Sequence, residues 1–183
     1  MNKLIELGKK HNIDIEIFKE KNNSTDISTL NNKVKLFQIT NVTSYIIKAI
    51  KNNRCVKIVT ENIKNTDEII NTLEEMFNTS DNKNNNRLCS GNIKNKVKNC
   101  EKIDYTKVTE DLLSLNELKN KYSCIKTIET EFSHAEIGKL ITNELNNCNM
   151  EDETYLNSYG ASITVEKNNQ TRVLYIGFYT KEY

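Results

Sequence analysis

The chain has 183 residues, of which 37% are hydrophobic and 28% are charged, and its formal net charge at pH 7 is +1. This length is enough to bury a hydrophobic core, and the recurring apolar residues exclude a wholly disordered chain. The small net charge excludes a global electrostatic field that would draw the protein to nucleic acid or to an anionic membrane.

The N-terminal part predicts a short helix followed by a strand. Residues 2–11 place apolar side chains on one side of a helix, with Lys9 and Lys10 near its end, where positive charge suits the helix dipole. In residues 13–18 apolar and polar residues alternate, which is the period of a half-buried strand. Asn22-Asn23-Ser24 then predicts a turn.

Two hairpins are predicted next. Their turns are Asn31-Asn32 and Lys51-Asn52-Asn53, because asparagine tolerates the left-handed backbone conformation that such short turns need. The paired strands are expected over residues 25–30 and 33–40, and over residues 45–50 and 54–60.

A second helix is predicted to begin at Asn65 or Thr66, with acidic residues in its first turn. After it, residues 79–103 lose all periodicity and predict an exposed connection rich in asparagine and lysine. Residues 79–107 include seven basic and three acidic residues. Residues 129–153 include one basic and seven acidic residues. Solvated surface explains both regions most simply.

The second half opens with a predicted helix that Thr109 caps and that reaches Tyr122. The chain then alternates between apolar strand patterns and polar connections. Strands are expected over residues 124–132, 135–142, 154–166 and 171–180, with a polar loop over 143–149 and a turn over 167–170.

These elements predict an α+β fold with a largely antiparallel sheet, built from two successive helix-plus-hairpins units with the helices packed on the sheet. We expect one domain over residues 1–183, with sub-units at 1–78 and 104–183 and the exposed connection over 79–103 between them.

The cysteines indicate a reducing compartment. There are five of them, and no two form a C-x-x-C pair. The N-terminus lacks the apolar core of a signal peptide, and no apolar run approaches the length that spans a bilayer. We therefore expect a cytoplasmic protein.

The sequence offers few residues that could form a metal site or a catalytic site. Only two histidines occur, His11 and His134, and they lie far apart in the sequence, which argues against a metal site. Glu131 and Glu136 flank His134 and offer acid-base chemistry, but an ordinary, partly exposed histidine at a strand end is the simpler interpretation.

A thiol nucleophile is the other enzymatic candidate, with Cys124 or Cys148 beside His134. The surrounding carboxylates would raise the pKa of a thiol, so the interpretation as small apolar residues is preferred. Phosphate-binding glycine motifs are absent from the sequence. The basic stretch contains one aromatic residue, Tyr105, which is too few to stack on the bases of a nucleic acid strand. We therefore expect no catalytic, cofactor-binding or metal-binding residue in this chain.

The order of elements resembles the N-terminal domain of the TldD/PmbA family, known as modulators of DNA gyrase and as zinc metallopeptidases. In the first half the resemblance lies in the opening helix and residues 13–18, the hairpin from Ser28 to Phe37, and the strands at 44–50 and 54–59. In the second half, residues 108–112 are similar to the family's V-S-P-E-E-A helix start. The strand at 125–133, with Glu129 and Ser133, resembles its V-x-x-x-E-x-S-x-S pattern, and residues 159–166 and 175–180 resemble its paired strands.

The resemblance implies a non-catalytic N-terminal domain that supports dimerisation and holds a peptide substrate, with the PmbA (TldE-like) branch slightly favoured. In the family, zinc is bound by a His-Glu-x-x-x-His helix and a later cysteine of the C-terminal domain, so zinc is expected only in that domain or in a partner. The expected partners are a TldD/PmbA-type subunit in a homo- or heterodimer and an unfolded peptide. The alternative is a free-standing peptide- or protein-binding adaptor.

Overall fold

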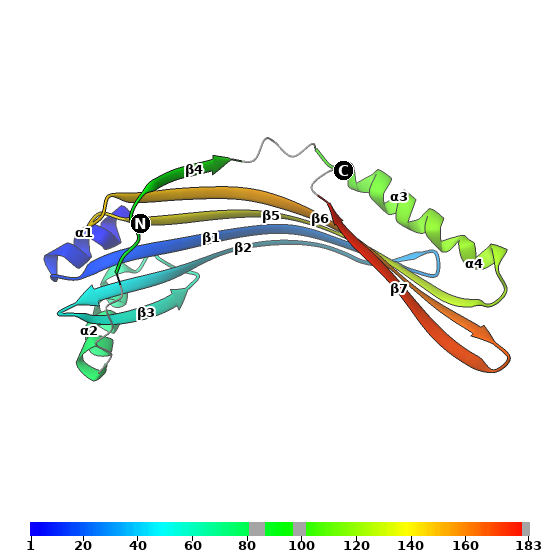
Figure 1. Ribbon diagram of the computed structural model, residues 1–183, viewed down its shortest axis with the longest axis horizontal. Helices are drawn as coiled ribbons and strands as arrows, with labels where there is room; N and C mark the ends of the chain where they lie inside the picture. Colours follow the sequence, from blue (N-terminus) through cyan, green and yellow to red (C-terminus); the bar gives the residue numbers. More distant parts are fainter. Residues whose placement is uncertain (81–86, 97–101, 181–183) are drawn as a thin grey trace. The chain divides into compact units, whose positions relative to one another are not determined.

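The computed structural model describes residues 1–80, 87–96 and 102–180 (Figure 1). Within this part the strands form one sheet of order β3-β2-β1-β5-β6-β4, and β7 pairs with β6. In chain order the elements are α1 (Asn2–Lys10), β1 (Asp14–Leu30), β2 (Lys33–Lys51), β3 (Arg54–Thr60), α2 (Thr66–Thr79), β4 (Asn92–Lys96), α3 (Tyr105–Asn116), α4 (Leu118–Lys121), β5 (Ile125–Asn143), β6 (Cys148–Lys167) and β7 (Gln170–Thr180).

The predicted α+β class with a mostly antiparallel sheet is confirmed. The pairs β2–β3 and β6–β7 are antiparallel, and β4 pairs with β6 in parallel. The finer prediction of two successive helix-plus-hairpins units stays a prediction.

Contacts divide the chain into two compact units, each built from three segments. Unit 1 comprises Met1–Asn22, Val42–Val97 and Ile137–Thr154, and unit 2 comprises Asn23–Asn41, Lys98–Glu136 and Tyr155–Tyr183. The units therefore interleave in sequence and do not coincide with the predicted sub-units 1–78 and 104–183. Four strands, β1, β2, β5 and β6, each contribute residues to both units.

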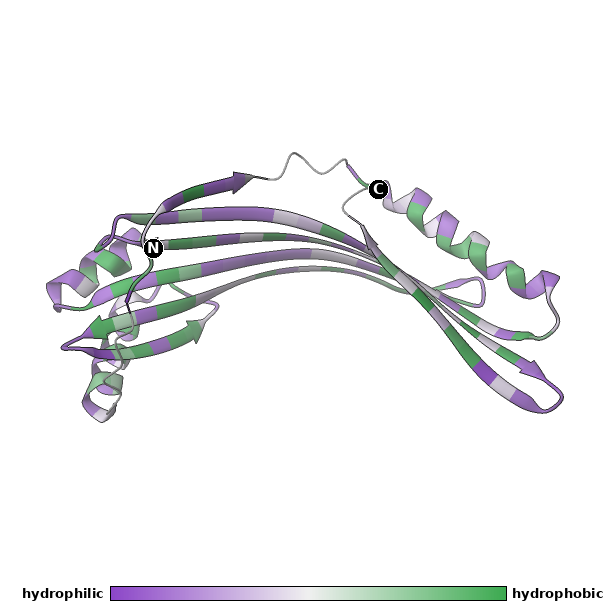
Figure 2. Cartoon of the chain, in the orientation of Figure 1, coloured by the Kyte–Doolittle hydropathy of each residue, from purple (hydrophilic) through white to green (hydrophobic). Residues whose placement is uncertain are grey.

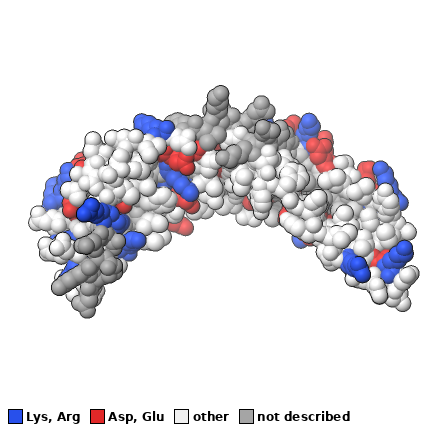
Figure 3. All heavy atoms as spheres, viewed as in Figure 1, with Lys and Arg blue, Asp and Glu red and all other residues white. Residues whose placement is uncertain are grey.

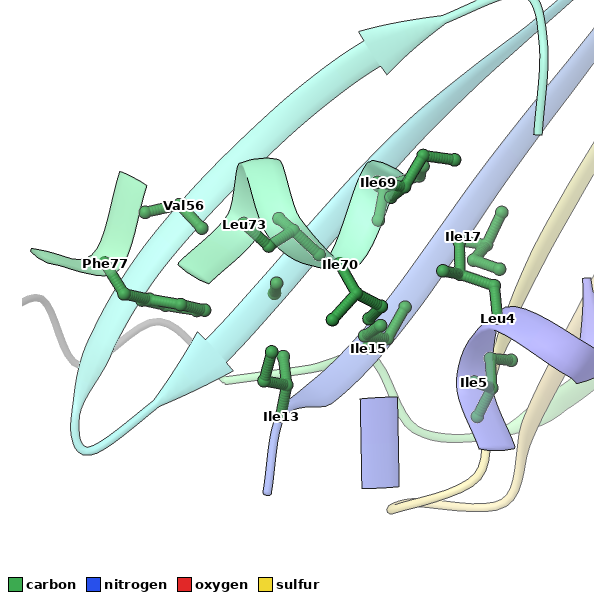
Figure 4. Close-up of a cluster of buried hydrophobic side chains, with 12 residues drawn as sticks. Leu4, Ile5, Ile13, Ile15, Ile17, Val56, Ile69, Ile70, Leu73 and Phe77 are labelled. Atoms are coloured by element: carbon green, nitrogen blue, oxygen red, sulfur yellow. The ribbon is translucent and has the colours of Figure 1, made fainter. Parts of the chain in front are cut away.

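The core of unit 1 lies between α2, α1 and the strands beneath them. Figure 4 shows side chains of α2, such as Ile70 and Leu73, pointing toward Ile15 of β1 and toward Ile13, which directly precedes β1. Leu73 is fully buried because the apolar positions of α2 recur every three or four residues and form one face. Arg54 of β3 donates to the carbonyl of Phe77 at 2.7 Å and so satisfies one of the last carbonyls of α2.

Unit 2 has a separate core beneath α3. Val108 and Leu112 of α3 contact Ile27 of β1 and Phe132 of β5 in one buried cluster. Asn116, at the last turn of α3, is fully buried and donates to Thr29 Oγ1 at 2.6 Å and to the Leu112 carbonyl at 2.8 Å.

The long strands correct several predicted boundaries. The turn predicted at Asn22-Asn23-Ser24 is wrong, because β1 runs through it without interruption. The breaks predicted between residues 40 and 45 and between residues 132 and 135 are wrong for the same reason. Neighbouring strands stabilise the backbone in these polar stretches, although their side chains carry no clear strand pattern.

Two further expectations need correction. Part of the predicted connection over 79–103 forms β4, which pairs with residues 149–153 of β6; residues 81–86 and 97–101 lie outside the described part. The cap of α3 is Asp104 and not Thr109, since the Asp104 carboxylate accepts from the amides of Thr106 and Lys107 at 3.0 and 3.2 Å.

The asparagine pairs predicted to form turns do so, although Lys51, predicted as part of the second turn, belongs to β2. Three hairpins close through Asn-Asn pairs in which both residues have a positive φ, as a two-residue turn of type I′ requires. The pairs are Asn31-Asn32 (47° and 64°), Asn52-Asn53 (50° and 61°) and Asn168-Asn169 (51° and 59°).

Candidate interaction edges of the sheet

The outer strand of the β6–β7 hairpin is an open edge of the sheet, called the β7 edge (Gln170–Thr180). Among the described strands β7 pairs with β6 alone, and every residue from Gln170 to Tyr179 is exposed. Figure 1 shows the two strands as one long hairpin, and Figure 2 shows hydrophobic colour recurring along β7 beyond the turn. An edge of this kind offers unpaired backbone groups to another strand.

One face of the hairpin is apolar. The register places Tyr159 opposite Phe178, Ala161 opposite Ile176, and Ile163 opposite Leu174. Because alternate residues share a face, these six form a continuous row of cross-strand pairs, called the apolar ladder. The rings of Tyr159 and Phe178 are stacked, with their centroids 5.0 Å apart.

The other face of the hairpin has a gap made by two glycines. Gly160 and Gly177 are direct partners in the register, and Tyr175 leans across Gly177. The Tyr175 hydroxyl reaches Glu131 of β5 and donates to its Oε1 at 3.1 Å. This hydrogen bond and the nearby negative charge raise the pKa of Tyr175.

Unit 2 has a second open edge on β2, called the β2 edge (residues 33–41). The strand β3 covers only Tyr45–Lys51 of β2, so no described strand pairs with the outer side of residues 33–41. This edge also exposes apolar side chains, including Phe37 and Ile39, but it carries two lysines. Lys35 forms an ion pair with Glu129 of β5 at 2.5 Å.

A chain of aromatic contacts runs through unit 2. Phe132 contacts Tyr105 of α3 on one side and Tyr159 of β6 on the other, with centroid distances of 6.4 and 4.9 Å. Tyr105 is also 6.4 Å from Phe37 of the β2 edge, and Tyr159 stacks on Phe178 of the β7 edge. The buried ring of Phe132 and the partly buried rings of Tyr105 and Tyr159 therefore join exposed rings at both edges and give each edge an apolar anchor.

Figure 3 shows basic and acidic side chains interspersed on the visible face. This pattern agrees with the net charge of +1.

His134 lies in a different setting from the one predicted. It is in the middle of β5 and only 5% exposed, so the expectation of a partly exposed histidine at a strand end is wrong. Its Nδ1 is 2.6 Å from Oδ1 of Asn157, and its Nε2 is 3.6 Å from Oε1 of Glu136, whereas Glu131 contacts Tyr175 instead. The contact with Asn157 orients the buried imidazole ring.

The structure does not support the thiol candidates. Cys124 is exposed just before β5, and the strand from Ile125 to His134 spans roughly 30 Å at about 3.3 Å per residue. Cys148 is buried, and this burial raises the pKa of its thiol, with Cys89 and Glu16 adding to the effect.

Sequence reasoning missed a buried carboxylate in unit 1. Glu16 of β1 is buried, and its Oε2 accepts from the Cys89 amide at 2.6 Å and from Asn143 Nδ2 at 3.0 Å. Burial, followed by the charge of Glu16, raises the pKa of the Cys89 thiol. This arrangement fastens the segment before β4 to the sheet. The only sign of this buried carboxylate in the sequence is that a glutamate stands between apolar residues of a predicted strand.

The described residues contain no group of side chains that could bind a metal ion. No three His, Cys, Asp or Glu side chains converge there in a way that could hold an ion. His11 instead lies at the end of α1 with its Nδ1 3.6 Å from Oε1 of Glu74. No helix in the described part of the chain is long and apolar enough to cross a membrane.

Comparison with solved structures gives matches over the whole chain. A candidate modulator of a DNA gyrase from Thermotoga maritima has a TM-score of 0.82 and 13% sequence identity, covering 99% of this chain and 42% of that protein. TldE from Thermococcus kodakarensis has a TM-score of 0.78 and 16% identity, covering 100% and 43%. A candidate modulator of DNA gyrase from Bacteroides thetaiotaomicron has a TM-score of 0.72 and 13% identity, covering 99% and 45%.

No protein-family model and no curated protein matches the sequence. The chain spans less than half the length of the three structures it matches. The resemblance to TldD/PmbA proteins stated from the sequence is nevertheless confirmed at the level of the fold, because TldE and both gyrase-modulator candidates have it. The chain thus has a fold that TldE and these two proteins contain within larger chains.

Proposed function

We propose that this chain is the non-catalytic N-terminal domain of a TldD/PmbA-type metallopeptidase assembly, where it supports dimerisation and holds the peptide substrate. The observation that carries the proposal is the match of the entire chain to a part of TldE. The open edges of unit 2 support it further, because they provide the surfaces that both roles need.

Peptide is held at the β2 edge. An extended peptide adds there as a further strand through main-chain hydrogen bonds, which depend little on its sequence. Lys33 opposes permanent pairing between copies of this edge through its positive charge, and Lys35 does so less because Glu129 partly balances its charge. Phe37 and Ile39 remain exposed to contact alternate side chains of the peptide.

Zinc belongs to another domain or to a partner subunit. The described residues of this chain do not fit a zinc site, so we assign no step of peptide hydrolysis to them. The expected result is that the purified chain supplied with zinc shows no peptidase activity. Zinc-dependent turnover that a chelator abolishes would contradict this part of the proposal.

Peptide holding is tested by fluorescence anisotropy with a labelled, unstructured peptide of mixed sequence. Ile39→Lys adds a third positive charge to the β2 edge and removes an apolar contact, so it is expected to weaken binding at least fivefold. Ile176→Lys at the β7 edge is the matched control and should bind as the wild type does. Equal binding by the wild type and Ile39→Lys would remove the β2 edge as the peptide site.

A further inference from the structure

The β7 edge lacks the devices by which proteins protect an open strand. Residues Val173–Thr180 contain no charged residue and no proline, and the adjacent Arg172 carries the only charge in β7. The β2 edge, in contrast, is protected by lysines. Soluble proteins rarely leave an edge of this length both apolar and unprotected unless another strand covers it.

We propose that β7 pairs antiparallel with β7 of a second copy of this chain, around a two-fold axis at Ile176. The inference deepens the dimerisation part of the proposed function by naming the surface and the register. It depends on the geometry of β7 and not on peptide binding at the β2 edge.

The backbone geometry permits this register, and the side chains select it among those that the backbone permits. Lys167 and Gln170 flank the two-residue turn and are register partners, so the even-numbered residues of β7 direct their amides toward β6. The odd-numbered residues therefore direct theirs to the open side. An axis at Ile176 pairs Tyr175 with Gly177 of the second copy, so residues with outward backbone groups meet and exchange hydrogen bonds.

The side chains are also complementary around this centre. On one face Leu174 lies opposite Phe178 of the second copy, with Ile176 opposite its own counterpart. On the other face Val173 lies opposite Tyr179, and the bulky Tyr175 lies opposite a glycine. Every one of these pairs is uncharged, and none sets two aromatic rings opposite each other. The apolar ladder of each copy then continues across the axis as one surface.

A second copy fits this edge better than an unrelated peptide does. The order of residues around Ile176 places a large apolar residue opposite each apolar one and a small residue opposite Tyr175, and this match requires the same sequence running in the reverse direction. In a two-fold interface each such contact away from the axis occurs twice.

The mass of the full chain in solution tests the proposal. Light scattering after size exclusion should give about 42 kDa, twice the chain mass of 21.2 kDa. Ile176→Lys places two positive charges against each other at the axis and is expected to weaken the dimer at least 30-fold. Ile39→Lys is the matched control, because Ile39 is 63% exposed and Ile176 is 68% exposed, and it should stay dimeric.

A cysteine at the axis tests the register. In Ile176→Cys the two introduced thiols face each other at the distance of directly opposed residues, so diamide oxidation should give a covalent dimer in high yield. Ile39→Cys and the wild type report the background from the native cysteines. A monomeric wild type, a dimer that survives Ile176→Lys, or crosslinking no greater than in Ile39→Cys would each overturn the inference. A monomer that still binds peptide at the β2 edge would leave the peptide-holding role standing.

Discussion

At the scale of single residues, the contact between Tyr175 and Glu131 depends on the two glycines beneath it. A Cβ atom at Gly160 would lie 2.3 Å from Oε1 and 2.7 Å from Cγ of Glu131, which is closer than non-bonded atoms approach. The missing side chain at Gly160 is thus the space in which Glu131 sits. The same space lets the carboxylate meet the Tyr175 hydroxyl.

The substitution Gly160→Ala should therefore displace Glu131 and break its hydrogen bond with Tyr175. Because Glu131 is exposed and its side chain can move aside, the cost is that of the lost hydrogen bond, about 0.5–1.5 kcal/mol in the free energy of unfolding, which urea denaturation measures. Gly138→Ala is the matched control, because Gly138 also lies in a strand and its nearest neighbouring atom would be 4.0 Å away. A loss of stability no larger in Gly160→Ala than in Gly138→Ala would disprove this role of Gly160.

Tyr175 should make stability depend on pH above its ordinary pKa of 10.0. The hydrogen bond to Glu131 and the charge of that carboxylate raise the pKa of Tyr175 in the folded state. A raised folded pKa means that the stabilisation is complete below the unfolded pKa and is lost as the pH rises through the folded value. Urea denaturation between pH 8 and 11.5 should show the wild type losing its advantage over Tyr175→Phe only at the alkaline end. An advantage independent of pH would count against this assignment.

The asparagine turns could be predicted at the residue scale because the cause is local. A two-residue turn needs two residues with positive φ, and asparagine adopts that conformation more readily than other residues with a side chain. His134 could not be placed in the same way. Its burial depends on Asn157, which is 23 residues away and on another strand.

At the scale of elements, α3 is held on the sheet by a group of buried hydrogen bonds in which Asn116 Oδ1 alone, among the atoms of the group, has no partner. Asn116 donates to Thr29, Thr29 and Thr130 share a hydrogen bond of 2.7 Å between their hydroxyls, and Thr130 donates to the Leu112 carbonyl at 3.2 Å. All three polar side chains are fully buried. The network therefore fixes the position of the C-terminal turn of α3 above β1 and β5.

Removing the amide in Asn116→Ala should cost about 1–2 kcal/mol, because Thr29 loses a buried donor and a small cavity forms, while Thr130 still donates to the Leu112 carbonyl. Ser114→Ala on the same helix is the control. Its hydroxyl is exposed and bonds only the Asp111 carbonyl, so the change should stay within about 0.5 kcal/mol. Equal losses in the two variants, measured by urea denaturation, would show that the buried network does not hold α3.

The ends of the strands near short turns could be predicted, whereas the continuity of the strands could not. Strands usually have 3–10 residues, but β1 has 17 and β6 has 20. In the middle of β1 the burial alternation stops, and Asn22-Asn23-Ser24 has the composition of a turn. Pairing with neighbouring strands decides the outcome there, and no local pattern records that pairing. The strand β4 escaped prediction for the same reason, since its short polar sequence pairs only through β6.

The open edges could not be identified from the sequence. Sequence patterns predicted the β6–β7 hairpin and its turn, but an edge is defined by the strand that is missing from its far side. The order of strands supplies that information. The charge-free run in β7 was visible in the sequence, yet it acquires meaning only once β7 is known to lie at an edge.

At the scale of the whole molecule, two hydrophobic cores share four continuous strands. Leu73 is fully buried in the core of unit 1, and Phe132 is buried in the core of unit 2. Within the described residues, the chain crosses from one unit to the other inside β1, β2, β5 and β6. Melting one core would fray strands whose remaining residues belong to the other.

The two units should therefore unfold together. Leu73→Ala and Phe132→Ala are each expected to cost about 3–5 kcal/mol, and each should lower one common transition without producing a second. Native-state hydrogen exchange reports both units separately, so Phe132→Ala should accelerate the most protected amides of unit 1 as well as those of unit 2. If Phe132→Ala released only unit 2, leaving exchange in unit 1 at wild-type rates, the shared strands would not couple the two cores.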